Sequence, residues 1–266
     1  MRNGWPGSAG TVTPWSATSI RWRCGSSRRR IPRCRAVSGR SPLRCCWRTP
    51  SPSRWRASPR GRGANVLRVG LTGGIASGKT TVRRVFERAG IPMLDADALT
   101  HELFAPGGEL VEEIAAHFGS EVVDPEGGID RKTLGARVFA DPGEREWLNG
   151  VVHPRIWQRI ETFLEHREAE GRRVAGVEAA LMVETGSAAN YDRLVVVVCR
   201  PEQQFERLAA RSGMSPEEAR LRLAAQMDPL EKARHADDLV DASGTLDETE
   251  AAAAAIARAL FARGGS

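Results

Sequence analysis

One stretch of eight residues constrains the fold of this chain more than any other feature. It reads Gly73-Gly74-Ile75-Ala76-Ser77-Gly78-Lys79-Thr80 and matches the pattern Gly-x-x-x-x-Gly-Lys-[Ser/Thr]. The apolar run at residues 66–71 before it predicts a buried strand. Apolar side chains recur at helical spacing after it, which predicts a helix over residues 79–89. A glycine-rich turn between a buried strand and a helix is typical of an α/β fold.

The chemistry of this loop is that of a phosphate-binding site. Its glycines let backbone N–H groups turn inward around a triphosphate, and the helix N-terminus adds a partial positive charge. We expect Lys79 to reach the β- and γ-phosphates of ATP and the Thr80 hydroxyl to bind Mg²⁺. A glycine-rich turn that precedes a helix by chance is the alternative, but motif and context agree. The predicted nucleotide-binding residues are Gly73, Gly74, Ala76, Ser77, Gly78, Lys79, Thr80 and Thr81.

The sequence from residue 66 onward alternates short apolar runs with helical patterns. This alternation predicts an α/β domain over residues 66–264. The β-branched run at residues 194–199 is typical of a parallel sheet covered on both faces. Asp141 and the capping box that begins at Ser215 predict helix starts. Further strands are predicted at residues 91–94, 174–177 and 238–240, helices in the region 98–164, and an alanine-rich helix at 246–262.

Residues 1–65 have a different composition from the rest. They contain 15 Arg and five Trp but no Lys, Asp or Glu, and they show no apolar period, so we expect a disordered extension. A nucleic-acid-binding tail, a transit peptide and translated sequence upstream of a misassigned start are the alternatives, and composition favours the last. The remaining residues carry 24 basic against 33 acidic side chains, so the overall charge of +6 comes from the extension.

Cysteine usage and the absence of other motifs argue against several classes of protein. Only Cys199 lies after residue 65, and no zinc-ligand spacing occurs, so we expect a reducing compartment, the cytoplasm. No apolar run is long enough to cross a membrane. None of the three lysines is followed by x-Asp, which argues against a guanine-specific GTPase, and too little sequence surrounds the core for a motor.

Two carboxylates, in Asp95-Ala96-Asp97, follow the second predicted strand. Open α/β sheets bind ligands at the carboxyl ends of their strands. A carboxylate at this edge can accept the proton of an acceptor hydroxyl, or hold Mg²⁺ through water. One of the two could instead cap the following helix, and for Asp95 this alternative is as good as the functional one.

Three stretches together resemble the signature motifs of the dephospho-CoA kinases, in order and at similar spacing. The resemblance covers residues 66–262 and includes Asp130-Arg131, Gln226 and the segment Ala236-Asp237-Asp238-Leu239-Val240-Asp241. It implies a P-loop kinase with a five-stranded parallel sheet, a helical substrate domain that binds CoA, and a lid. The three stretches are Leu71-Thr72-Gly73-Gly74-Ile75-Ala76-Ser77-Gly78-Lys79, Asp95-Ala96-Asp97 and Leu148-Asn149-Gly150-Val151-Val152-His153-Pro154.

The resemblance also implies roles for single residues. Asp97 would be the base or the group that orients the hydroxyl, with Asp95 near the substrate. Arg131 and His153 would lie in the CoA-binding region, although a His before Pro154 could equally cap a helix. Arg207 and Arg211 would be catalytic lid arginines, and their alternative is a solvated helix face. Phosphoryl transfer needs more cations than Lys79 alone, which favours the catalytic role.

The implied reaction is phosphorylation of the ribose 3′-hydroxyl of dephospho-CoA by ATP, the last step of CoA synthesis. A kinase for another small alcohol or nucleoside is the alternative enzyme, and a nucleic-acid-binding protein driven by residues 1–65 is the alternative from another class. The sequence departs from the family at Ala180, where Pro is usual, and at Glu178, where Asp is common. Ala242-Ser243-Gly244 stands in place of Asn-Gly, which puts adenine contacts there in doubt.

Overall fold

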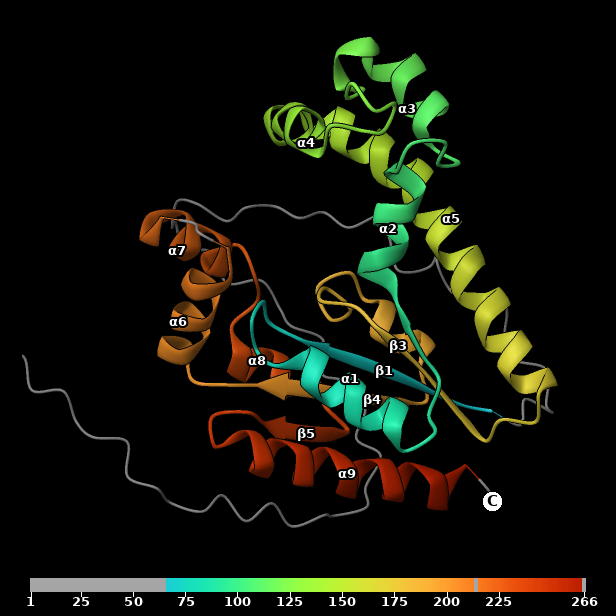
Figure 1. Ribbon diagram of the computed structural model, residues 1–266, viewed down its shortest axis with the longest axis vertical. Coiled ribbons are helices and arrows are strands. Elements are labelled where there is room, and N and C mark those ends of the chain that lie inside the picture. Colours follow the sequence, from blue (N-terminus) through green and yellow to red (C-terminus); the bar gives the residue numbers. More distant parts are fainter. Residues whose placement is uncertain (1–65, 213–214, 265–266) are drawn as a thin grey trace, which may run out of the picture. The chain divides into compact units, whose positions relative to one another are not determined.

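The computed structural model describes residues 66–212 and 215–264 (Figure 1). The expectations for residues 1–65, including their disorder, lie outside the described residues. The side chain of Arg211 is also outside them, although its backbone belongs to a helix. No helix within the described ranges is both long enough and apolar enough to cross a membrane.

The centre of the structure is a five-stranded sheet in which every neighbouring pair of strands is parallel. The strand order is β2-β3-β1-β4-β5, so the strand before the glycine-rich loop is the middle one. The prediction of a five-stranded parallel sheet is therefore confirmed. The strands are β1 (Leu67–Gly73), β2 (Met93–Asp95), β3 (Val174–Glu178), β4 (Arg193–Val198) and β5 (Asp238–Asp241).

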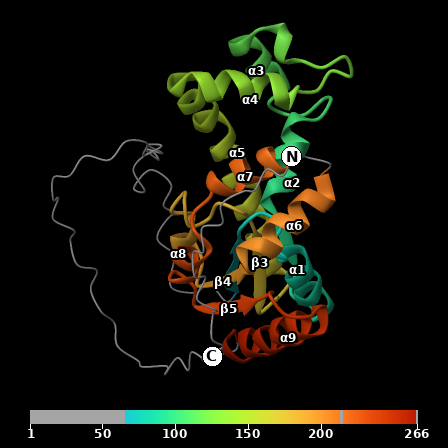
Figure 2. The ribbon, with the colours of Figure 1, turned by 90° about the vertical axis from the view of Figure 1, so that its left-hand side faces the viewer.

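Helices cover both faces of the sheet, as the apolar run in β4 predicts. Alternate β4 residues point to opposite faces, because side chains alternate along a strand. Val195 and Val197 join one core cluster with α1 (Lys79–Arg88) and α9 (Leu246–Arg263), which also contact each other. Leu194 and Val196 join a second cluster on the other face, packed against α5 (Pro142–Ala169). Figure 2 shows α9 running along the sheet beside α1.

The region between β2 and β3 is helical and has an apolar cluster of its own. The cluster joins α5 to the other helices of the region, and its fully buried members include Leu103, Leu110 and Ile114. Both views place α3 and α4 at the ends of α2 and α5 that lie away from the sheet (Figures 1 and 2). The helices are α2 (Ala96–Phe104), α3 (Val111–Phe118), the 3₁₀ turn η2 (Ser120–Val122) and α4 (Arg131–Ala140).

The start of α5 is predicted correctly, and the helix then continues to Ala169. The Asp141 side chain caps it by accepting hydrogen bonds from the N–H groups of Gly143 and Glu144. His153 and Pro154 lie in its interior. The interpretation of His153 as a helix cap is therefore wrong. A proline inside a helix lacks the N–H that would donate to the carbonyl four residues earlier, and its ring clashes with that carbonyl. Here the packing of α5 against two apolar clusters outweighs this cost.

The remaining helices follow β4. They are α6 (Pro201–Ser212), α7 (Pro216–Ala224) and the short α8 (Pro229–Ala233), with the 3₁₀ turn η3 (Ser187–Asn190) before β4. Helix α7 begins with the predicted capping box, in which Ser215 Oγ accepts from the Glu218 N–H and the Glu218 carboxylate accepts from the Ser215 N–H. Helix α9 begins with a similar box between Thr245 and Glu248.

Candidate active site

The glycine-rich loop joins β1 to α1 at the carboxyl end of the central strand. A side chain at Gly73 would collide with the Val197 carbonyl oxygen and come within 2.7 Å of Ser77 Oγ. Gly78 has a φ of 104°, in the left-handed region that glycine tolerates best, and Ala76 also has a positive φ, of 56°. Position 73 therefore requires glycine because the backbone of β4 lies too close for a side chain, and position 78 favours glycine because of its positive φ.

Lys79 begins α1 and folds back over the loop. Its Nζ donates hydrogen bonds to the carbonyl oxygens of Gly73, at 3.1 Å, and Gly74, at 3.0 Å. Burial lowers the pKa of Lys79, while the carboxylates of Glu178 and Asp97 act in the opposite direction. The ammonium group thus lies in the curve of the loop, where a phosphate oxygen could replace the carbonyls as its partner.

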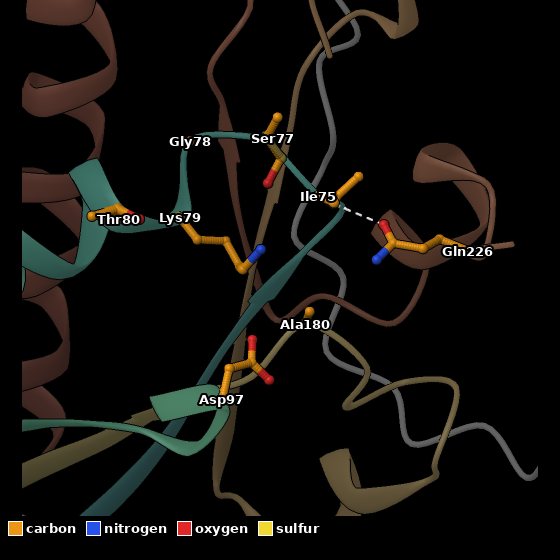
Figure 3. A pocket seen from close by; sticks show the side chains of 9 residues that line it. Ile75, Ser77, Gly78, Lys79, Thr80, Asp97, Ala180 and Gln226 are labelled. Carbon is orange, nitrogen blue, oxygen red and sulfur yellow. Dashed lines mark hydrogen bonds between the residues drawn. The ribbon is translucent and has the colours of Figure 1, made fainter. Parts of the chain in front are cut away.

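A cavity of about 240 Å³ lies over this loop (Figure 3). It brings together one carboxylate, the loop ammonium and the Thr80 hydroxyl. Of the predicted nucleotide-binding residues, Gly73, Gly74 and Thr81 do not line it, although the first two shape the loop. The lining residues are Ile75, Ala76, Ser77, Gly78, Lys79, Thr80, Asp97, Ala180 and Gln226.

The two candidate carboxylates, Asp95 and Asp97, have different roles in the structure. Asp95 caps α2, and its Oδ1 accepts from the N–H groups of Asp97, at 3.0 Å, and Ala98, at 3.1 Å. Asp97 lies in the first turn of α2, and its carboxylate points across the cavity toward the Lys79 ammonium (Figure 3). Desolvation raises the pKa of the Asp97 carboxyl, and the Lys79 charge partly opposes this shift. Asp97 is therefore the carboxylate that can meet a ligand in the cavity.

A charged cluster lies beside the cavity. Glu178 is the residue opposite Asp95 in the β2–β3 pairing, so the two carboxylates are neighbours. Arg83 from α1 lies between them, with its Nε 2.8 Å from Glu178 and its Nη2 3.9 Å from Asp95. Burial raises the pKa of Glu178, against the nearby charge of Lys79. The arginine offsets part of the negative charge at this edge of the sheet.

Two glutamines hold the apex of the loop, and neither is among the predicted site residues. Gln226 Oε1 accepts from the Ile75 N–H at 2.7 Å (Figure 3), and Gln204 Nε2 donates to the Ile75 carbonyl at 2.6 Å. Gln226 is among the residues that resemble the dephospho-CoA kinases, so the sequence could have predicted it as a site residue. No local pattern distinguishes the buried Gln204, because its importance depends on α6 lying against the loop.

Arg207, Arg131 and His153, which the sequence also predicts as site residues, do not line the cavity. Arg207 in α6 donates from Nη2 to the Ala242 carbonyl at 2.9 Å, and its Nη1 lies near Gly78. Arg131, at the start of α4, contacts His101, whose Nδ1 lies 2.8 Å from the Asp97 carbonyl. His153 lies within α5, where burial lowers its pKa. Arg207 and Arg131 are thus next to the site, and neither lines it.

The donor groups of the cavity suit Mg²⁺. This ion prefers oxygen ligands and usually takes only one or two from the protein, with water and phosphate oxygens supplying the rest. The Thr80 hydroxyl and the Asp97 carboxylate lie in the same cavity. Within the described residues no group of three or more His, Cys, Asp or Glu side chains forms a dedicated metal site. The Thr80 hydroxyl and the Asp97 carboxylate would therefore fit a Mg²⁺ ion that takes few ligands from the protein.

A phosphate-binding loop after the middle strand of a parallel sheet, facing a carboxylate at the end of the sheet, defines a P-loop kinase. Comparison with known proteins narrows this class. Residues 67–248 match the family model described as Dephospho-CoA kinase. The chain belongs to the dephospho-CoA kinase family.

Individual relatives agree with the family match. The dephospho-CoA kinase of Symbiobacterium thermophilum is 46% identical over 191 residues, which cover 72% of this chain and 80% of that protein. The corresponding protein of Geobacter sulfurreducens is 43% identical and covers 68% and 92%. A crystal structure of a Thermus thermophilus protein has a TM-score of 0.63 at 32% identity, covering 73% and 97%. A dephospho-CoA kinase structure from Campylobacter jejuni, at 23% identity and a TM-score of 0.52, supports the fold alone.

Proposed function

We propose that the chain transfers the γ-phosphoryl group of ATP to the ribose 3′-hydroxyl of dephospho-CoA and so completes CoA synthesis. Membership in the family supports the choice of acceptor. One observation supports the reaction type: Lys79, Thr80 and Asp97 line the same cavity, although they come from the first turns of two different helices, α1 and α2. A lysine for the phosphates, a hydroxyl for the metal ion and a carboxylate for the acceptor hydroxyl are recurring parts of phosphoryl-transfer sites.

On the nucleotide side, the proposal assigns the triphosphate to the loop. The cavity lies at the N-terminus of α1. The first N–H groups of a helix are free to bind an anion there, and the helix dipole favours its negative charge. Lys79 exchanges its carbonyl partners for β- and γ-phosphate oxygens. The Thr80 hydroxyl would hold Mg²⁺, which when bound would neutralise phosphate charge. Arg207 and Arg211 are the proposed lid arginines.

On the acceptor side, Asp97 binds the 3′-hydroxyl and takes its proton. The 3′-oxygen forms a bond to the γ-phosphorus, the bond from that phosphorus to the bridging oxygen breaks, and ADP leaves with the electron pair. The raised pKa of Asp97 makes it a better proton acceptor than an ordinary aspartate. Arg131 and His153 are proposed to contact the CoA portion, and Asp95 serves as a helix cap.

The acceptor is tested by competition. The full chain is supplied with ATP, Mg²⁺ and one of four acceptors, namely dephospho-CoA, adenosine, uridine or shikimate, and ADP release is followed. We expect dephospho-CoA to have the highest kcat/KM. Preference for any of the other three would replace the proposal with the alternative of a kinase for another small alcohol or nucleoside. Transfer to no acceptor would remove the proposed function altogether.

A further inference from the structure

Two glutamines bind the apex of the phosphate-binding loop from outside it. Gln204 of α6 is buried, with 5% of its surface exposed, and its Nε2 donates to the Ile75 carbonyl at 2.6 Å. Gln226 Oε1 accepts from the Ile75 N–H at 2.7 Å (Figure 3). Both backbone polar groups of Ile75 are therefore bound, and each bond fixes the orientation of one peptide group of the loop.

The peptide group between Gly74 and Ile75 is held from both sides. Gln226 binds its N–H, and its carbonyl oxygen accepts from Lys79 Nζ at 3.0 Å. The same oxygen also accepts from the Ser77 N–H at 3.2 Å. This peptide group therefore keeps two partners, Gln226 and Ser77, even when Lys79 turns to a ligand.

The next peptide group, between Ile75 and Ala76, is held at its carbonyl end by Gln204. Because a trans peptide group is planar, the N–H of Ala76 must point away from Gln204. Ala76 lines the cavity over the loop, and Gln204 does not. No carbonyl oxygen of the described backbone accepts from the Ala76 N–H. The bond to Gln204 thus directs a backbone donor that a ligand in the cavity can use.

The backbone conformation of Ala76 gives independent support. Its φ of 56° makes it the one non-glycine residue with a positive φ in the part of the chain that the structure describes. This conformation costs free energy in a residue with a Cβ, and it persists where the surrounding contacts over-determine the backbone, often at ligand sites. The hydrogen bond from Gln204 to the adjoining carbonyl is such a contact.

We propose that Gln204 is a positioning residue for the nucleotide: by holding the Ile75 carbonyl it aims the Ala76 N–H at a phosphate oxygen of the bound triphosphate. The inference deepens the proposed function and rests on it, since it takes the ligand of the loop to be a triphosphate. Gln204 touches no phosphate in this account and acts only through one peptide group. A donor that is already oriented spares the ordering that a mobile peptide would undergo on binding.

The test compares two competitors for the nucleotide site of the full chain. Inorganic tripolyphosphate and adenosine each displace a fluorescent ATP analogue, in EDTA and at 0.15 M or higher salt, so that neither a metal ion nor remote charge contributes to the readout. Gln204→Met nearly keeps the shape of the side chain and removes the donor. We expect its Kd for tripolyphosphate to rise about tenfold, as for one hydrogen bond to a charged group, with the Kd for adenosine unchanged. Unchanged tripolyphosphate affinity in the folded variant would overturn the proposal.

Gln203→Met is the matched control. Gln203 is the neighbour of Gln204 in α6, and its Nε2 also donates to a backbone carbonyl, that of Ser243, at 3.0 Å. This bond does not involve the loop, so the variant should bind tripolyphosphate as tightly as the wild type. Thermal melting shows that both variants are folded. Equal losses of affinity in the two variants would assign the effect to the packing of α6 as a whole, and the proposal would be wrong.

Gly74→Ala reaches the same bond from the side of the loop, and it serves if Gln204→Met does not fold. Gly74 has no positive φ, and the three atoms nearest to an added methyl group all belong to Gln204 and Gln226. The methyl group collides with Gln204 Nε2, so we expect the same loss of tripolyphosphate affinity. In the background of Gln204→Ala the collision is gone, and the methyl group should cost little more. Additive losses, or no loss in Gly74→Ala, would contradict the role of Gln204.

Tripolyphosphate binding needs no acceptor, so this inference and the proposed function can fail separately. If Gln204→Met binds tripolyphosphate weakly but the wild-type chain phosphorylates no dephospho-CoA, only the proposed function fails. If the wild type phosphorylates dephospho-CoA and Gln204→Met binds tripolyphosphate as tightly as the wild type does, only the role of Gln204 fails. Tripolyphosphate that does not displace the analogue from the wild type would also overturn the inference.

Discussion

Asp97 is the residue on which the proposed chemistry depends most. Replacing it by Asn keeps the shape of the side chain and removes the basic carboxylate. We expect kcat to fall about 10²- to 10⁴-fold, the usual range for a general base, with the KM for ATP nearly intact. Asp95→Asn is the comparison, because Asn caps a helix as well as Asp does and the loss should be far smaller. Steady-state kinetics of both variants measure the two losses in kcat. A larger loss in Asp95→Asn than in Asp97→Asn would make Asp95 the base.

The pH dependence of turnover follows from the same carboxylate. A base works only when it is deprotonated, so activity is lost as the pH falls through the pKa of Asp97. Desolvation raises that pKa, so the acidic limb of the kcat/KM profile should lie above the value of about 3.9 for an ordinary aspartate. The profile is measured with and without Asp97→Asn. A limb that persists unchanged in the variant belongs to another group.

At the scale of elements, two glycines with different surroundings should respond in opposite ways to alanine. Gly73→Ala places a methyl group against the Val197 carbonyl, so we expect a loss of about 1–3 kcal/mol in the free energy of unfolding and a damaged nucleotide site. Gly135 lies inside α4 with open space around its added methyl group, so Gly135→Ala should gain about 0.5–1 kcal/mol. Urea unfolding of both variants measures the difference. A stable Gly73→Ala protein with normal ATP binding would contradict the close approach between β1 and β4.

At the scale of the whole molecule, we propose that residues 66–264 form the catalytic unit and that residues 1–65 are dispensable. The family match begins at residue 67, and among the described residues those that line the cavity lie at or beyond Ile75. A chain that begins at Val66 should unfold cooperatively and turn over dephospho-CoA as fast as the full chain. Lost activity after this truncation would mean that the extension takes part in folding or in substrate capture.

The same truncation tests the charge argument. It changes the formal net charge from +6 to about −9, because all 15 basic residues of the extension leave and no acidic residue goes with them. Any binding of the full chain to DNA should be steeply salt-dependent and should disappear. DNA binding that survives truncation would place a nucleic-acid surface on the kinase domain instead.

The sequence by itself determined the features that depend on neighbours along the chain. The strand, loop and helix around Lys79, the parallel sheet, and the caps at Asp141 and Ser215 were all predicted, because turn chemistry and apolar spacing are local properties. The family, too, could be recognised from short motifs. One alternative was wrong: His153, before Pro154, could have capped a helix, but both residues lie inside α5, where packing continues the helix.

Only the tertiary structure decided which groups meet. Asp95 and Asp97 are two residues apart and chemically alike, yet one caps a helix and the other faces the cavity, and that depends on where α2 leaves the sheet. Gln204 and Lys232 acquire their partners from segments more than 50 residues away, at Ile75 and Ala180. No local pattern records such contacts, because the energy of a buried polar group depends on the partner that the fold places beside it.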